Sequence, residues 1–187
     1  MSSKNTLARP VPDHSGNIPA RVRQLIARMT LAEKIGQTCQ VNGSLEDLPR
    51  RLQEGQVGSV LNEVNVDTVN ELQRIAIEES RLGIPLLVGR DVIHGFKTIF
   101  PIPLGQAASW NPELVRQGAE VAAIEAAAAG INWTFAPMID ITRDPRWGRI
   151  AESLGEDSYL CSRLGAAMVR GFQGDKLNKP GSIAACA

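Results

Sequence analysis

The sequence is poor in several features, and each shortage argues against a class of protein. It has no excess of charge, because 20 Lys and Arg residues balance 20 Asp and Glu residues, and it has no basic tract. A protein that binds the nucleic-acid backbone needs a basic patch, so we expect no nucleic-acid partner. It also lacks a run of about 18 apolar residues, so no membrane-spanning helix and no membrane partner are expected.

The cysteines and glycines form none of the motifs that indicate a disulfide framework, a metal site or a cofactor site. Cys39, Cys161 and Cys186 are odd in number and far apart, and they form no CxxC pair or zinc spacing. Neither a disulfide framework nor a metal site is therefore predicted. No dinucleotide or phosphate fingerprint follows an apolar run, so we expect no cofactor. Residues 1–15 are polar and lack the apolar stretch of a signal peptide, which predicts a cytoplasmic protein.

What the sequence does contain is a regular alternation of apolar runs and helical patterns. Apolar runs predict strands at 35–41 (weakly), 57–61, 84–88, 131–136 and 182–187. Helical patterns occur at 18–29, from Thr30 onward, and at 45–54, 66–80, 112–129 and 158–172. This order is typical of parallel βα units, whose apolar strands are covered on both faces.

The loops that follow the strands favour one α/β architecture. Polar loops begin at Gly89 and Pro137, which indicates a (β/α) barrel rather than a Rossmann sheet. A closed barrel needs eight strands and typically ~250 residues, and this chain supplies about the first four to five βα units. We therefore expect a partial (β/α)8 TIM-type barrel with parallel strands and the helices outside. Residues 1–17 are predicted to be a polar N-terminal arm, and residues 18–187 an incomplete barrel domain truncated in a strand.

Two polar loops carry the residues that can do chemistry. Residues 89–101 read GRDVIHGFKTIFP, and residues 135–159 read FAPMIDITRDPRWGRIAESLGEDSY. Asp91 follows a predicted strand, and in a barrel that position places its carboxylate at the mouth. There it can accept hydrogen bonds from sugar hydroxyls, or it can pair with Arg90 or His94 and only shape the loop.

The second loop leaves more than one interpretation open. The guanidinium groups of Arg143 and Arg149 can bind hydroxyls or a neighbouring carboxylate. Trp147 can stack on a sugar face or serve as a packing anchor. Glu152 and Glu156 can be acid or base, but acidic residues just before a helix more often cap it, and Glu156 and Asp157 stand at such a position. Another possibility is an unrelated βα enzyme with Asp140 and Glu152 as its acid–base pair. The acid–base pairing leaves the first loop unexplained.

Together the two loops resemble those of glycoside hydrolase family 3, and most closely its bacterial β-glucosidase branch. The resemblance covers about residues 18–187. It implies an N-terminal barrel in which Asp91 binds hydroxyls of the terminal glucosyl unit and Arg149 holds the same sugar. The residues expected to support this site are Arg143, Trp147 and His94.

The resemblance also implies a reaction. It is that of an exo-acting retaining β-glycosidase, which hydrolyses terminal non-reducing β-D-glucosyl residues of a β-glucoside or oligosaccharide. Such chemistry needs two carboxyl groups about 5 to 5.5 Å apart. The family's nucleophilic Asp and acid/base Glu are expected beyond Ala187, so we expect no catalytic residue in this chain and no activity from it alone.

This expectation raises the question of what completes the barrel. The chain is expected to need the remaining barrel half and a second domain, or else to self-associate. The alternative function is a non-catalytic half-barrel or sugar-binding module that another chain completes.

Overall fold

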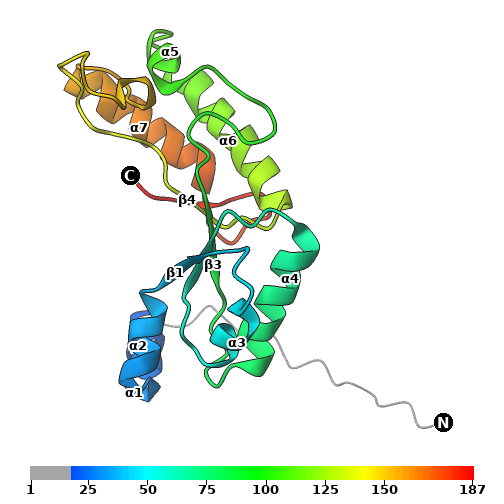
Figure 1. Cartoon of the computed structure of the whole chain (residues 1–187). Helices are drawn as coiled ribbons and strands as arrows, with labels where there is room; N and C mark the ends of the chain where they lie inside the picture. Colours follow the sequence, from blue (N-terminus) through cyan, green and yellow to red (C-terminus); the bar gives the residue numbers. More distant parts are fainter. Residues whose placement is uncertain (1–17) are drawn as a thin grey trace.

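The computed structural model describes residues 18–187 as a five-stranded parallel sheet with helices packed against it (Figure 1). The strands are β1 (Gln40–Asn42), β2 (Ser59–Leu61), β3 (Leu87–Arg90), β4 (Trp133–Thr134) and β5 (Ala184–Ala185). Each strand pairs in parallel with the next one along the chain. The predicted parallel βα order is confirmed, whereas the predicted arm at 1–17 lies outside the described residues.

The helices alternate with the strands. They are α1 (Ile18–Arg28), α2 (Leu31–Gln37), α3 (Leu48–Gln53), α4 (Val66–Arg74), α5 (Pro103–Ala107), α6 (Pro112–Ala128) and α7 (Ser158–Gln173). A π-helical turn, η1 (Ile75–Glu79), continues α4, and a 3-10 turn, η2 (Ile150–Glu152), precedes α7. Figure 1 shows α3, α4, α6 and α7 in an arc around the sheet. No helix in the described part of the chain is both long and apolar enough to cross a membrane.

Side-chain caps explain where several helices begin. Thr30 Oγ1 accepts a hydrogen bond from the Glu33 N–H, and the Glu33 carboxylate accepts one from the Thr30 N–H. This capping box starts α2, the helix predicted from Thr30 onward. The Asn111 side chain accepts two backbone N–H bonds at the start of α6, and Asp157 caps α7 in the same way.

The strand predicted at 84–88 lies further along the chain, as β3. Pro85 has no N–H to donate to a strand ladder. The backbone of Leu86 bonds to side-chain amides instead: its N–H donates to Gln73 Oε1, and its carbonyl accepts from Gln73 Nε2 and Asn132 Nδ2. These amides therefore replace the ladder at this position, and the strand begins only at the next residue.

Two hydrophobic clusters fill the space between the sheet and the helices. One lies beneath α6 and α7 and contains Ile131 and Phe172, and the other lies beneath α3 and α4 and contains Leu52 and Val60. The opposite face of the sheet is not covered in the same way, since Leu87 on β3 is 47% exposed. This differs from the prediction that both faces of the strands are covered. The reason is that five strands do not close a barrel, so no described strand lies across from this face.

Helices α6 and α7 approach each other closely at Gly171. A Cβ atom on Gly171 would lie 2.3 Å from the Arg116 carbonyl oxygen and 2.6 Å from the Ala119 Cβ. We expect Gly171→Ala to lower the free energy of unfolding by about 1–3 kcal/mol, because the added methyl group forces the helices apart. The matched control is Gly118→Ala on α6, where the new Cβ would meet the Phe100 ring only at 3.8 Å.

The control is expected to raise the free energy of unfolding by about 0.5–1 kcal/mol, because alanine has the better helix propensity. Urea denaturation of both variants and the wild type measures the difference. Equal stability of the two variants would show that the helices do not make the close approach described here.

Candidate functional site

The C-terminal ends of β3 and β4 form one edge of the sheet, because the two strands are parallel neighbours. Asp91 follows β3 directly and is exposed. The next residue, Val92, is fully buried, and its N–H donates to Oγ1 of the buried Thr134 on β4. The backbone on either side of Asp91 is therefore held by the sheet and the core, while the carboxylate stays accessible at the edge where barrel folds bind ligands.

The neighbours of Asp91 have partners of their own. Arg90 Nη1 donates to Asn62 Oδ1 over 2.7 Å. His94 Nδ1 lies 3.0 Å from the carbonyl oxygen of Phe100. The Asp91 carboxylate itself accepts no hydrogen bond from any residue that the structure describes. The alternative in which Asp91 pairs with Arg90 or His94 and only shapes the loop therefore finds no support.

The loop after Asp91 is closed tightly on itself and on α6. The Phe100 N–H donates to the His94 carbonyl, and Gly95 has a φ of 122°, with the Thr98 carbonyl oxygen 2.0 Å from where a Cβ would stand. Only glycine fits there. Glu125 on α6 accepts from the Thr98 N–H over 2.7 Å and from its hydroxyl over 2.6 Å. His94 thus helps to close this loop, and its support of sugar binding stays a prediction.

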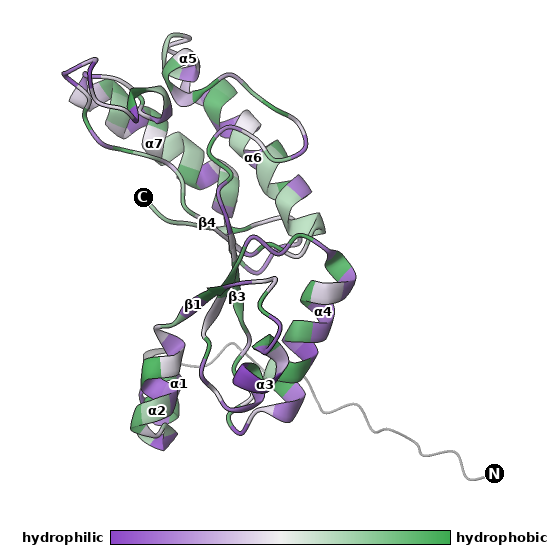
Figure 2. Ribbon diagram, in the orientation of Figure 1, coloured by the Kyte–Doolittle hydropathy of each residue, from purple (hydrophilic) through white to green (hydrophobic). Residues whose placement is uncertain are grey.

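The second loop, residues 142–155, is called the arginine loop below and is fixed at its base. The Thr142 hydroxyl donates to Ser153 Oγ over 2.6 Å, and both residues are buried. The Gly155 N–H donates to Ser153 Oγ, and the Thr142 N–H donates to the Gly155 carbonyl. Gly155 has a φ of 105°, a conformation that favours glycine. The hydrophilic arginine loop therefore leaves and rejoins the fold at one fixed place beside α7 (Figure 2).

Arg149 and Glu152 form an ion pair within the arginine loop. Arg149 Nη2 lies 2.7 Å from Glu152 Oε2, and Nε lies 3.2 Å from both carboxylate oxygens. The hydrogen bonds to Glu152 raise the pKa of Arg149, and the charges of Asp140 and Asp91 raise it further. The structure thus brings Arg149 into the electrostatic range of Asp91, from a loop that follows a different strand.

The same ion pair decides how Glu152 can act. Its hydrogen bonds with Arg149 lower the pKa of the Glu152 carboxyl group. A carboxylate that is held ionised is poorly suited to donate a proton. The hypothesis of an acid–base pair made of Asp140 and Glu152 is therefore not supported.

The remaining predicted residues lie nearby. Arg143 and Trp147 line a surface hollow together with Ile141, Thr142 and Asp144. Trp147 is half-buried and Arg143 is exposed. Their support of sugar binding stays a prediction.

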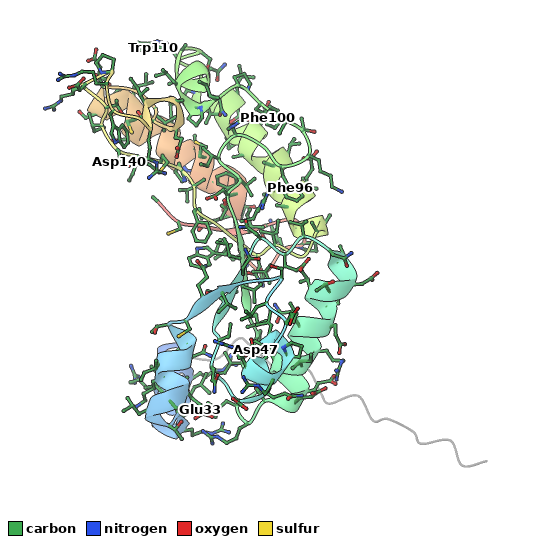
Figure 3. All side chains as sticks on the ribbon, in the orientation of Figure 1. Glu33, Asp47, Phe96, Phe100, Trp110 and Asp140 are labelled. Atoms are coloured by element: carbon green, nitrogen blue, oxygen red, sulfur yellow. The ribbon has the colours of Figure 1, made fainter. Side chains whose placement is uncertain are left out.

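Two more aspartates flank the arginine loop. Asp144 is paired with Arg146 over 2.6 Å, and the hydrogen bonds from Arg146 lower the pKa of Asp144. Asp140 is exposed in the segment between β4 and the arginine loop, beside α7 (Figure 3). Of the three carboxylates whose charges raise the pKa of Arg149, Glu152 forms an ion pair with it, whereas Asp140 and Asp91 form none with any described residue.

No metal site accompanies these residues in the described part of the chain. From residue 18 onward, no group of three or more His, Cys, Asp and Glu side chains is placed to hold a metal ion. Cys161 is buried, and burial is the main cause that raises its pKa. It therefore packs as a small apolar side chain.

The residues that hold the site in place were not found from the sequence. Thr134 has a signal in hindsight, because it is a polar residue inside the apolar run 131–136. Thr142, Ser153 and Glu125 have none, since each is an ordinary polar residue whose partner lies elsewhere in the chain. Such pairings depend on how the loops fold, which local sequence patterns do not specify.

Comparison with known proteins gives consistent matches. Residues 30–185 match the Glycosyl hydrolase family 3 N terminal domain. A periplasmic beta-glucosidase from Salmonella typhimurium is 44% identical over 159 residues, which cover 83% of this chain and 21% of the relative. A structure of beta-glucosidase from Listeria innocua in complex with glucose matches with a TM-score of 0.81 at 43% identity, covering 89% of this chain and 26% of that one.

The relatives also correct one prediction. A periplasmic beta-glucosidase/beta-xylosidase from Dickeya chrysanthemi is 31% identical over 201 residues, which cover 88% of this chain and 30% of the relative. The expected cytoplasmic location is wrong by this comparison, because relatives from two organisms are named periplasmic. A polar stretch at 1–15 was too weak a basis for assigning a compartment. The chain spans about a fifth to a third of the length of the curated relatives it matches.

Proposed function

The chain belongs to glycosyl hydrolase family 3, and from that premise we propose that it carries part of the sugar subsite of an exo-acting retaining β-glucosidase. Membership confirms the predicted partial (β/α)8 barrel, which is the fold of the family's N-terminal domain. The names of the Salmonella and Listeria relatives support a β-glucoside as the substrate. The same kind of evidence supports a periplasmic location.

One observation carries the proposal: the Asp91 carboxylate accepts no hydrogen bond from residues 18–187, and it lies within electrostatic range of the positively charged Arg149. A free carboxylate accepts hydrogen bonds from sugar hydroxyls, and a guanidinium donates to their oxygens. The two groups thus complement the alternating donors and acceptors of a sugar ring. Their place at the ends of parallel strands supports a ligand site.

The chemical step is proposed to use carboxyl groups outside residues 1–187. Retention requires a nucleophile and an acid/base on opposite sides of the scissile bond. In this chain Asp144 and Glu152 are engaged in ion pairs, and Asp91 is assigned to sugar hydroxyls. The family's nucleophilic Asp and acid/base Glu are therefore expected from another part of the complete protein.

The open sheet supports a proposal about domain organisation. Among the described residues β1 and β5 each pair on one side only, and Leu87 is about half exposed on the uncovered face of the sheet. Unpaired strand edges and exposed apolar surface favour association. We propose that 18–187 is an incomplete barrel domain, whose open face is covered by the remaining barrel strands or, when these are missing, by self-association. Completion by a separate chain is the alternative.

The test is an assay of the intact protein that carries this chain, with a panel of aryl glycosides. We expect release of the aryl group from the β-glucoside, with the β-anomer of glucose formed first, as NMR spectroscopy of the early product measures. The matched control is the aryl α-glucoside, which should not be hydrolysed. Absence of hydrolysis of every β-glycoside, or initial formation of the α-anomer, would contradict the proposed function.

A further inference from the structure

The hydrogen-bond donors of Arg149 are divided between two edges of its guanidinium group. Nε and Nη2 point to the Glu152 carboxylate, and Nη2 also contacts Met138 Sδ over 3.4 Å. Nη1 has no partner among residues 18–187. Because a guanidinium is planar and rigid, fixing one edge also fixes the direction of the other. Any ligand of Arg149 therefore meets the edge that contains Nη1.

Glu152 is held firmly enough to act as the fixed partner. It ends the 3-10 turn η2, where its N–H donates to the Arg149 carbonyl. The next residue, Ser153, is 0% exposed and is bound to the Thr142 hydroxyl at the base of the arginine loop. The Glu152 side chain is only 33% exposed, whereas that of Arg149 is 55% exposed. Of the two, Arg149 is therefore the one that is free to move if the pair is broken.

A competing arrangement is available to Arg149. Asp91 and Asp140 both attract it electrostatically, and neither accepts a hydrogen bond from any described residue. A guanidinium released from Glu152 would be drawn towards one of these free carboxylates, because a direct charge-assisted hydrogen bond is strong. Pairing with Asp91 would occupy the acceptor that the proposed site needs for sugar hydroxyls.

We propose that Glu152 is a positioning residue, which holds Arg149 with its Nη1 edge free for the sugar and prevents it from pairing with Asp91. This inference rests on the proposed function, because it assigns a role within the same sugar site. The proposal gives Asp91 and Glu152 different roles. Asp91 accepts hydrogen bonds from the ligand, whereas Glu152 never touches the ligand and acts through Arg149.

Kinetics of variants of the intact protein test the proposal. Glu152→Gln keeps the side-chain shape but removes the charge that binds Arg149, so kcat/KM for an aryl β-glucoside should fall about tenfold to a hundredfold, a loss typical of a small misplacement. Glu152→Asp retains the carboxylate and should recover part of that loss. Replacing Glu152 with Gln in an Arg149→Ala background should change kcat/KM less than about twofold, because the group it positions is already absent.

The matched control is Glu71→Gln on α4. Arg74 Nε and Nη2 donate to Glu71 over 2.8 and 2.6 Å, so the variant removes an ion pair with the same spacing and the same guanidinium edge. It should leave kcat/KM unchanged, which shows that loss of such a pair alone is not the cause. Thermal unfolding of every variant shows whether it is folded.

Each remaining outcome is decisive. Full activity of Glu152→Gln, or an equal loss in the Arg149→Ala background, would overturn the role of Glu152. A Glu152→Gln variant that fails to fold while Arg149→Ala folds would also overturn it, since Glu152 would then stabilise the loop independently of Arg149. An inactive wild type would overturn the proposed function itself. An active wild type that loses activity with Arg149→Ala but not with Glu152→Gln would overturn only this inference.

Discussion

Replacing Asp91 with alanine is expected to lower kcat/KM of the intact protein for an aryl β-glucoside by about a thousandfold, which corresponds to about 4 kcal/mol of transition-state stabilisation. The carboxylate accepts no hydrogen bond from the described protein, so its hydrogen-bonding capacity is open to a ligand. Hydrogen bonds to sugar hydroxyls strengthen as the oxocarbenium-like transition state forms. The loss should therefore appear mainly in kcat rather than in KM alone.

The fold should survive this substitution, which separates a binding role from a structural one. Asp91 is exposed, and its backbone is held by Val92 and Thr134 rather than by its own side chain. The thermal unfolding temperature of Asp91→Ala should match that of the wild type. Asp175→Ala is the control, because Asp175 is also an exposed aspartate but pairs with Lys179 on the surface. Unchanged turnover of Asp91→Ala would remove this residue from the sugar site.

Sequence patterns were sufficient to predict the fold because the elements depend on local signals. The capping box at Thr30 and the cap at Asn111 specify helix starts, and these starts agree with the helices predicted from Thr30 onward and at 112–129. Strand positions were less accurate, as β3 shows. There the amides of Gln73 and Asn132 replace the strand ladder at Leu86, and such long-range bonds leave no mark in the local pattern.

For the candidate site, the sequence predicted positions better than roles. Asp91 stands at the end of β3 because parallel strands place their following residues at one edge. Whether it pairs with Arg90 or His94 depended on partners that lie apart in the chain, namely Asn62 and Phe100. The structure was needed to show that Arg90 and His94 bind these other residues and that Asp91 accepts no hydrogen bond from either of them.

In the arginine loop, too, the sequence does not predict which side chains pair with one another. Its sequence contains several arginines and carboxylates within a few residues, so many ion pairs are sterically possible. Folding selects Arg149 with Glu152 and Arg146 with Asp144, because Thr142 and Ser153 fix where the loop begins and ends. That selection decides which carboxylates remain available for chemistry.

The polypeptide of residues 1–187, purified alone, is therefore expected to show no hydrolysis of an aryl β-glucoside above background. Retaining chemistry needs two carboxyl groups about 5 to 5.5 Å apart, one ionised as a nucleophile and one able to donate a proton. Near the proposed site the hydrogen bonds from Arg146 and Arg149 lower the pKa values of Asp144 and Glu152, which keeps both ionised and paired.

Of the four carboxylates considered for the reaction, namely Asp91, Asp140, Asp144 and Glu152, the first two accept no hydrogen bond from any described residue. Asp91 is assigned to sugar hydroxyls, so a second catalytic carboxyl group is missing even if Asp140 were to take part. The assay compares 1–187 with the intact protein at equal concentration, after circular dichroism has shown that the isolated chain retains its helices. Turnover by the isolated chain that disappears with Asp140→Ala would show that catalytic carboxyl groups lie within these residues, and the assignment of catalysis to other parts of the protein would then be wrong.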